Sequence, residues 1–116
     1  MIRGGIVTLM VKDVGGAVRF YVETLGMKLV EEATEHWAVI DAGEGFQIGL
    51  HGGRTSATPP SPEAPSIGFH AKLPLAETIA ILENRGVAVT RRDQGPRSFA
   101  HFTDPDGNAL YVVEQR

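Results

Sequence analysis

The feature that most constrains this chain is a repeat of predicted structure along its 116 residues. Apolar, strand-like segments begin at Ile6 and at Ser66, and glycines suited to end a helix stand at Gly26 and Gly86, so both pairs are 60 residues apart. Few residues are identical between the two copies, so the repeat is one of architecture. Such a repeat predicts two copies of one supersecondary unit.

Each copy reads as a β-α-β-β-β unit, because alternating apolar segments surround one stretch with helical spacing. The first copy predicts strands at 6–11, 27–32, 37–41 and 46–51, with a helix that follows a candidate N-cap, Asp13. The second copy predicts strands at 66–73, 87–91, 98–103 and 109–114, with a helix from Pro74 to Gly86. A strong turn signal, Asp104-Pro-Asp-Gly107, separates the last two strands. The expected class is therefore α+β, with tandem βαβββ modules whose sheet curls around a cavity.

The length favours a single domain over residues 1–116. Four of the seven prolines fall within residues 53–65, which predicts a linker there. Module one is then 1–52 and module two is 66–116. The linker is short enough that we expect the modules to stay packed together.

Composition excludes several classes of partner and location. Hydrophobic residues make up 42% of the chain and charged residues 22%, as in ordinary globular proteins. The net charge of −3 makes nucleic acid and an anionic membrane surface poor partners. The apolar segment 6–11 is too short to span a bilayer and does not have the pattern of a signal peptide, so we expect a cytoplasmic protein. The absence of cysteine excludes disulfides and thiolate chemistry.

The two faces of the predicted strands differ in content. One face is uniformly apolar and should pack under the helices. The other mixes aromatic rings, hydroxyls, glycines and histidines, a mixture that favours a half-wet cavity for a small molecule over a face in bulk water. The candidate ligand-binding residues on or near this second face are Thr8, Trp37, Gly49, His51, Ser66, His70, Phe99, His101 and Tyr111.

Simpler interpretations of these residues stay open at this point. His101 could pack and form hydrogen bonds locally beside the turn, and His51 and His70 lie towards strand ends, where solvent is the expected surrounding. Trp37 fits the core and the cavity equally, because the segment 37–40 is apolar on both faces. Tyr111 has core neighbours on both sides, which favours a place in the cavity wall.

Three phrases of the sequence resemble the vicinal oxygen chelate superfamily, which includes glyoxalase I, bleomycin-resistance proteins and extradiol dioxygenases. They are Val7-Thr-Leu-Met-Val-Lys-Asp13, then Arg19-Phe-Tyr-Val-Glu-Thr-Leu-Gly26, and Asp104-Pro-Asp-Gly-Asn108. The resemblance covers the whole chain and implies the paired βαβββ fold. It also implies a homodimer in which modules pair within or between chains.

The resemblance places the usual metal ligands of the superfamily at four positions of this chain, and none has a suitable side chain. The residues there are Ile6, Gly49, Ser66 and Tyr111. Metal sites of this kind need His, carboxylate or thiolate ligands. We therefore expect no metal and no other cofactor. A shifted site built from His51, His70 and His101 is the alternative, although His51 and His70 stand about 7 and 13 Å beyond the usual positions along their strands.

The sequence supports three hypotheses about function. The first is a metal-free binding protein of the bleomycin-resistance type, which holds an aromatic or antibiotic-like molecule. The second is an enzyme, either a metal-dependent lyase, isomerase or dioxygenase with the shifted histidine site, or an acid–base enzyme with His101 as its candidate catalytic residue. The third is a dimerising domain with a vestigial cavity.

Overall fold

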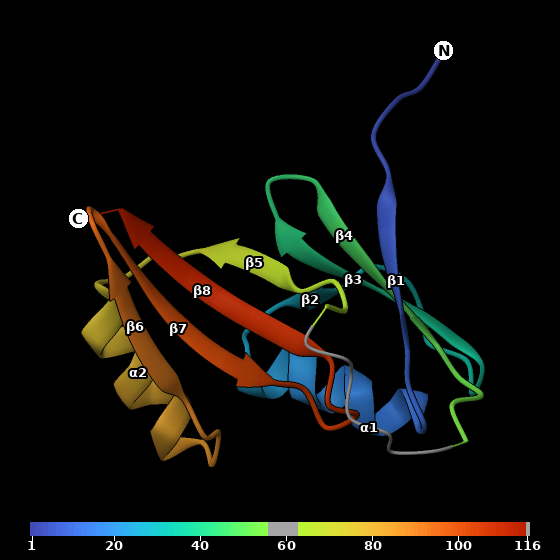
Figure 1. Cartoon of the computed structure of the whole chain (residues 1–116). Coiled ribbons are helices and arrows are strands. Elements are labelled where there is room, and N and C mark those ends of the chain that lie inside the picture. Colours follow the sequence, from blue (N-terminus) through green and yellow to red (C-terminus); the bar gives the residue numbers. More distant parts are fainter. Residues whose placement is uncertain (56–62, 116) are drawn as a thin grey trace. The chain divides into compact units, whose positions relative to one another are not determined.

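A computed structural model describes residues 1–55 and 63–115 of the chain (Figure 1). The chain divides into two compact units, Met1–Ala57 and Thr58–Arg116. Each unit follows the β-α-β-β-β order that the repeat predicts. Residues 56–62 of the predicted linker lie outside the described residues. That the units act together as one domain, with modules at 1–52 and 66–116, stays a prediction.

Unit 1 is a four-stranded mixed sheet with one helical segment. Its elements are β1 (Ile6–Met10), α1 (Val14–Arg19), a π-helical turn η1 (Phe20–Thr24), β2 (Lys28–Leu29), β3 (Trp37–Gly43) and β4 (Phe46–His51). The strands are ordered β1-β4-β3-β2, and β1 runs parallel to β4 while the other pairs are antiparallel.

Unit 2 repeats this arrangement. Its elements are β5 (Ile67–His70), α2 (Leu75–Asn84), β6 (Thr90–Gln94), β7 (Arg97–Thr103) and β8 (Ala109–Gln115). The order is β5-β8-β7-β6, with β5 parallel to β8. The predicted α+β class and both β-α-β-β-β modules are confirmed, with one sheet in each unit.

The predicted strand at 87–91 is largely wrong, because the observed strand β6 begins at Thr90 and ends at Gln94. Gln94 pairs with Arg97 across a short turn, and the ladder runs from there back to Thr90. The amide of Val87 instead donates to the carbonyl of Leu82, at the end of α2. The hairpin turn and the helix end therefore decide the bounds of this strand, and they outweigh its apolar residues.

The predicted strand at 27–32 is shorter in the structure, again because the end of the helical segment uses an amide from its first residue. Met27 follows the helical segment and donates its amide to the carbonyl of Tyr21 in η1, and only Lys28 and Leu29 form the strand β2. The helix starts as predicted after Asp13, but the Asp13 carboxylate makes no capping hydrogen bond. Gly26 has a positive φ of 77°, which suits its predicted place after the helical segment.

The core of each unit lies between its helix and one face of its sheet. In unit 1, α1 packs chiefly on β3 and β4. The side chains buried there are Val14, Ala17, Tyr21, Ala38, Ile40, Ile48 and Leu50. In unit 2, α2 packs on β7 and β8. The buried side chains there are Ile67, Leu75, Leu82, Ala100, Phe102 and Leu110. The apolar face predicted from strand alternation is therefore the helix-covered face.

Two residues of that face differ from the prediction. Val7 and Phe46 are each 38% exposed, because α1 is short and the two residues lie towards the far end of the sheet from it.

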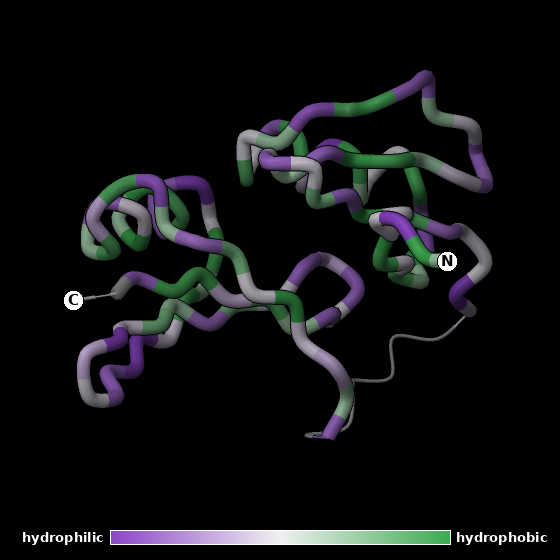
Figure 2. The backbone as a smooth tube through the Cα atoms, turned by 90° about the horizontal axis from the view of Figure 1, so that it is seen from above, coloured by the Kyte–Doolittle hydropathy of each residue, from purple (hydrophilic) through white to green (hydrophobic). Residues whose placement is uncertain are grey.

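Hydrophobic and hydrophilic stretches alternate along the chain (Figure 2). Among the described residues, no helix is both long enough and apolar enough to cross a membrane.

Candidate ligand-binding site

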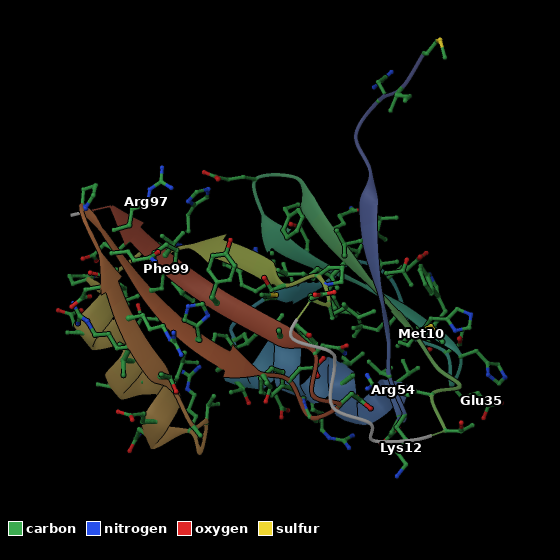
Figure 3. The ribbon with its side chains drawn as sticks, viewed as in Figure 1. Met10, Lys12, Glu35, Arg54, Arg97 and Phe99 are labelled. Atoms are coloured by element: carbon green, nitrogen blue, oxygen red, sulfur yellow. The ribbon has the colours of Figure 1, made fainter. Side chains whose placement is uncertain are left out.

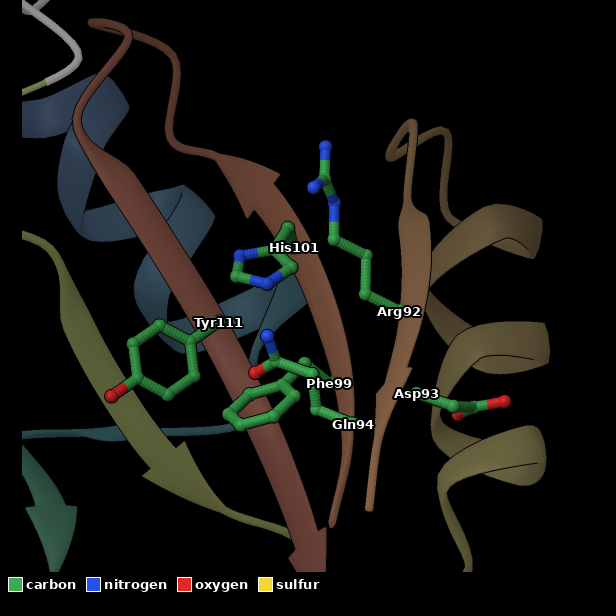
Figure 4. Close-up of a pocket in the computed structure, with 6 residues that line it drawn as sticks. All are labelled: Arg92, Asp93, Gln94, Phe99, His101 and Tyr111. Atoms are coloured by element: carbon green, nitrogen blue, oxygen red, sulfur yellow. The ribbon is translucent and has the colours of Figure 1, made fainter.

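The candidate site lies on the face of the unit 2 sheet that α2 leaves uncovered. Strand register sets its layout: His101 on β7 lies between Thr90 and Tyr111, and Phe99 lies between Arg92 and Val113. Because side chains alternate along a strand, Phe99 and His101 share one face while Ala100 and Phe102 point into the core. Figure 4 shows Phe99, His101 and Tyr111 grouped on that face.

The three rings form one aromatic cluster. The ring centroids of Phe99 and His101 are 5.8 Å apart and nearly parallel, with 21° between the planes. Tyr111 lies 5.8 Å from Phe99 and 5.6 Å from His101, at angles of 64° and 45°. Such offset and edge contacts are favourable for aromatic pairs. The rings therefore support one another and present a common wall to a ligand.

Tyr111 takes its position because the residue opposite it has no side chain. Gly68 on β5 is the register partner of Tyr111, and a Cβ at position 68 would overlap the Tyr111 ring. The ring thus lies across β5 in the space that any other residue would fill. Gly68 is needed for close packing, since its backbone is that of an ordinary strand.

A pocket of about 650 Å³ opens beside this cluster. It is lined by Arg92, Asp93, Gln94, Phe99, His101 and Tyr111. Arg92 and Gln94 lie on the same face of β6. Gln94 reaches towards the rings and Arg92 extends beside His101, whereas the carboxylate of Asp93 points the other way (Figure 4). Asp93 Oδ1 instead accepts a hydrogen bond from Arg91 Nε at 3.2 Å. The pocket therefore combines an aromatic wall with one guanidinium and one amide.

The surroundings of His101 favour its neutral form. Partial burial lowers the pKa of His101 below its ordinary value of 6.5, and the nearby positive charge of Arg92 lowers this pKa further. A neutral imidazole has one nitrogen that donates a hydrogen bond and one that accepts. His101 can therefore pair with either kind of polar group on a ligand.

Two other predicted residues of unit 2 stand apart from this pocket. His70 is an exposed residue on β5 opposite Val113, and Ser66 is exposed just before that strand. Of the predicted residues in this unit, the structure thus brings together Phe99, His101 and Tyr111, while Ser66 and His70 do not line the pocket.

The predicted residues of unit 1 form a related arrangement on its own sheet. Trp37 lies over Gly49, where a Cβ would overlap the indole ring. The Trp37 and His51 rings are 6.2 Å apart at 72°, and Thr8 is the register partner of Gly49. His51 is exposed, and its Nδ1 lies 2.6 Å from the carbonyl oxygen of Gly52. Each unit thus places a large ring over a strand glycine.

A second pocket, of about 520 Å³, lies in unit 1 near the β3–β4 turn. Its lining residues are Gly5, Ile6, Val7, Glu44, Gly45 and Phe46. Glu44 has a positive φ of 54°, which is uncommon outside glycine and places this residue in the tight turn between the strands. None of the nine predicted ligand-binding residues lines this pocket.

The residues at the positions implied for a metal do not fit a metal ion. Ile6 has no donor atom, and Trp37 covers Gly49 so closely that a carboxylate could not stand there. In unit 2 the phenol ring of Tyr111 lies over Gly68. Among residues 1–55 and 63–115, no group of three or more His, Asp or Glu side chains is assembled as a metal site.

Arg92 and Gln94 were missed by sequence reasoning. The predicted strand ended at Arg91, so neither residue was assigned a face. The signal that could have found them is the turn at Gly95 and Pro96, because a tight hairpin there pairs Gln94 with Arg97 and puts Arg92 opposite Phe99.

Solved structures with the same fold are numerous, and three show its range. TnmS3, an antibiotic binding protein from Streptomyces sp. CB03234, is 24% identical with a TM-score of 0.78, covering 100% of this chain and 98% of that chain. A glyoxalase/bleomycin resistance protein from the same Streptomyces strain is 24% identical with a TM-score of 0.73, covering 97% of this chain and 100% of that chain.

An integron cassette protein from the mobile metagenome of V. cholerae is 23% identical with a TM-score of 0.72, covering 97% of this chain and 94% of that chain. A comparison with curated proteins finds no match.

The family model for the Glyoxalase/Bleomycin resistance protein/Dioxygenase superfamily matches residues 5–112, which include both βαβββ units from β1 into β8. With the paired modules, the DPDGN turn and this match in agreement, the chain belongs to that superfamily.

Proposed function

We propose that this protein binds a small aromatic molecule in the unit 2 pocket, without a metal ion and without converting it. The observation that carries the proposal is the cluster of Phe99, His101 and Tyr111 in the wall of one pocket of about 650 Å³. That volume falls within the range of small-molecule sites, which are mostly apolar with a few placed polar groups.

The solved neighbours support binding as a function for this fold. TnmS3 is described as an antibiotic binding protein, and it shares the fold along its full length. The sequence of TnmS3 is only 24% identical to this chain, so the class of ligand follows here from the residues that line the unit 2 pocket. An antibiotic-like aromatic compound remains one class within the proposal.

The residues at the implied metal positions favour binding over the metal-dependent alternative. A shifted metal site would need His70 and His101 from unit 2 together with His51 from unit 1. Within unit 2, His70 is on β5 and His101 is on β7, with β8 between them, so their backbones are about 10 Å apart across the sheet. His70 is also exposed and does not line the pocket that His101 lines, and the described residues hold no assembled group of three or more His, Asp or Glu side chains.

Ligand binding can be tested with a neutral planar probe, 2-naphthamide, titrated into the full untagged chain by calorimetry and two-dimensional NMR. We expect shifts of the amides of β7 and β8 and weaker binding by roughly tenfold in Phe99→Ala, because a stacking surface is lost. Phe46→Ala, a matched change in unit 1, should leave binding unchanged. If no planar aromatic probe binds, or if Phe99→Ala binds as tightly as the parent, the proposal is wrong.

The proposal includes a cytoplasmic homodimer. Edge strand β1 carries exposed apolar side chains, Ile6, Val7 and Met10, which support association with a second copy. Light scattering coupled to gel filtration measures the mass directly, and a monomer at high concentration would contradict the dimer.

A further inference from the structure

The pocket of unit 2 contains a positively charged side chain, Arg92, beside its aromatic wall. Arg92 projects from β6 beside the rings, and it lies close enough to His101 to act on its charge state. Arg97 on β7 shares the face of Phe99, and both are labelled in Figure 3. Arg97 does not line the pocket, so Arg92 supplies the guanidinium group that stands beside the aromatic cluster.

The acidic side chains of the neighbouring elements are directed elsewhere. Asp93 pairs with Arg91 at 3.2 Å, and its carboxylate points away from the rings (Figure 4). Glu114 on β8 accepts a hydrogen bond from the amide of Leu75 at 2.6 Å, at the start of α2. Asp104 accepts its hydrogen bonds from amides of its own turn. The Asp93 carboxylate is thus paired with Arg91, and those of Glu114 and Asp104 are bonded to backbone amides away from the rings, which leaves Arg92 as the charged side chain beside the aromatic cluster.

The geometry around Arg92 matches a planar anion. Its register partner is Phe99, and its guanidinium extends beside His101 (Figure 4). A planar ligand that covers the Phe99 and His101 rings therefore brings its edge towards the guanidinium. A guanidinium donates two parallel hydrogen bonds to a carboxylate, and the amide of Gln94 on the same side of β6 can donate another. His101, held neutral, adds no charge but retains one N–H donor.

We infer that the ligand is a planar aromatic carboxylate, with its rings against Phe99 and Tyr111 and its carboxylate paired with Arg92. The inference rests on the proposed function and narrows it to one charge class. Neutral aromatics bind more weakly, because they leave the guanidinium without a partner ion. Aromatic cations are rejected, because they meet a charge of the same sign.

Three probes of the same shape test the charge preference: 2-naphthoate, 2-naphthamide and 2-naphthylmethylammonium, each titrated into the full chain by calorimetry. We expect the carboxylate to bind roughly tenfold more tightly than the amide, as for a charge-assisted hydrogen bond, and the ammonium to bind most weakly. The advantage of the carboxylate should shrink as salt is raised, because this pair is exposed to solvent.

Variants of adjacent arginines supply the matched control. Arg92→Gln should reduce the advantage of 2-naphthoate to about twofold or less, whereas Arg91→Gln, on the opposite face of the same strand, should keep it. Arg92→Lys retains the positive charge but not the two parallel donors, so it should keep part of the advantage of 2-naphthoate over 2-naphthamide. A partial effect in this variant would show that the loss in Arg92→Gln does not come from misfolding.

The outcomes separate the inference from the proposed function. If the amide or the ammonium binds as tightly as the carboxylate, and Phe99→Ala weakens that binding, the charge preference is wrong and aromatic binding stands. If Arg92→Gln leaves the carboxylate preference intact, the role of Arg92 is wrong. If none of the three probes binds, both proposals are wrong.

Discussion

Tyr111 lies across β5 because position 68 has no side chain, and this pair shows how single residues shape the pocket. The same relation holds for Trp37 and Gly49 in unit 1. In both units the glycine is in an ordinary strand conformation, so close packing by a neighbouring ring is its physical role. A ring placed in this way cannot be moved without altering the pocket wall.

Gly68→Ala should therefore displace the Tyr111 ring. We expect a loss of about 1–3 kcal/mol in the free energy of unfolding, as for an overpacked site, together with weaker binding of 2-naphthamide. Chemical denaturation and calorimetry measure the two effects. Gly5→Ala is the control, because a Cβ there meets no atom within 4 Å. Adding Tyr111→Ser to Gly68→Ala should recover part of the stability, and no recovery would argue against the overlap.

The lowered pKa of His101 predicts a pH dependence of stability. In the unfolded chain His101 titrates near its ordinary value of 6.5, whereas burial and Arg92 lower its pKa in the folded protein. Below pH 6.5 the unfolded chain then binds more protons, so the free energy of unfolding falls as the pH falls towards the folded pKa. Well above pH 6.5 both states are neutral at this residue, and its contribution to the pH dependence vanishes.

His101→Gln removes this titration, so its free energy of unfolding should fall less than that of the parent over the same acidic range. Urea denaturation at a series of pH values gives the comparison. Parallel curves for the two proteins would show that His101 titrates alike in the folded and unfolded states.

At the scale of elements, the turn between β7 and β8 holds the strands that carry the site. Asp104 is only 4% exposed. Its Oδ1 accepts hydrogen bonds from the amides of Asp106 and Asn108, both at 2.9 Å, and its Oδ2 accepts one from Asn108 Nδ2 at 2.9 Å. One carboxylate thus satisfies three donors of the turn and sets the register that places Tyr111 beside His101.

Asp104→Ala should lower the free energy of unfolding by about 1–3 kcal/mol, because the partly buried amides of the turn lose their acceptor. Asp104→Asn keeps one acceptor oxygen and should lose less. Thermal and urea denaturation rank the variants. Equal stability of Asp104→Ala and the parent would show that the turn forms without this carboxylate.

At the scale of the whole molecule, the two units share one architecture but differ in the chemistry of their sheets. Both place an aromatic ring over a glycine, yet the described guanidinium-bearing pocket belongs to unit 2. The superfamily frame is kept in both units, while the four positions that the resemblance assigns to metal ligands carry Ile6, Gly49, Ser66 and Tyr111. The side chains available for function in unit 2 are therefore aromatic rings and a guanidinium group.

Removal of metal should not change this protein. Purified without a His-tag, it should contain no stoichiometric transition metal by elemental analysis, since the positions implied for ligands carry no His, carboxylate or thiolate side chain. Its melting temperature and its affinity for 2-naphthamide should be the same before and after treatment with a chelator. One tightly held Zn, Fe or Ni ion per chain would overturn this view and favour the histidine alternative.

Much of this protein follows from its sequence alone. The repeat, the α+β class and the helix-covered face come from local signals, because alternation, helical spacing and turn residues act over a few neighbours. The grouping of Phe99, His101 and Tyr111 on one face also follows from strand parity.

Tertiary structure decided the rest, because it depends on the register in which the strands pair. The hairpin turn at Gly95 places β6 at Thr90–Gln94, where the prediction had a strand at 87–91, and so puts Arg92 opposite Phe99. Pairing of β5 with β8 placed Gly68 under the ring of Tyr111. The sequence determined which side chains share the face of each strand, and only the register between strands decided which of them meet.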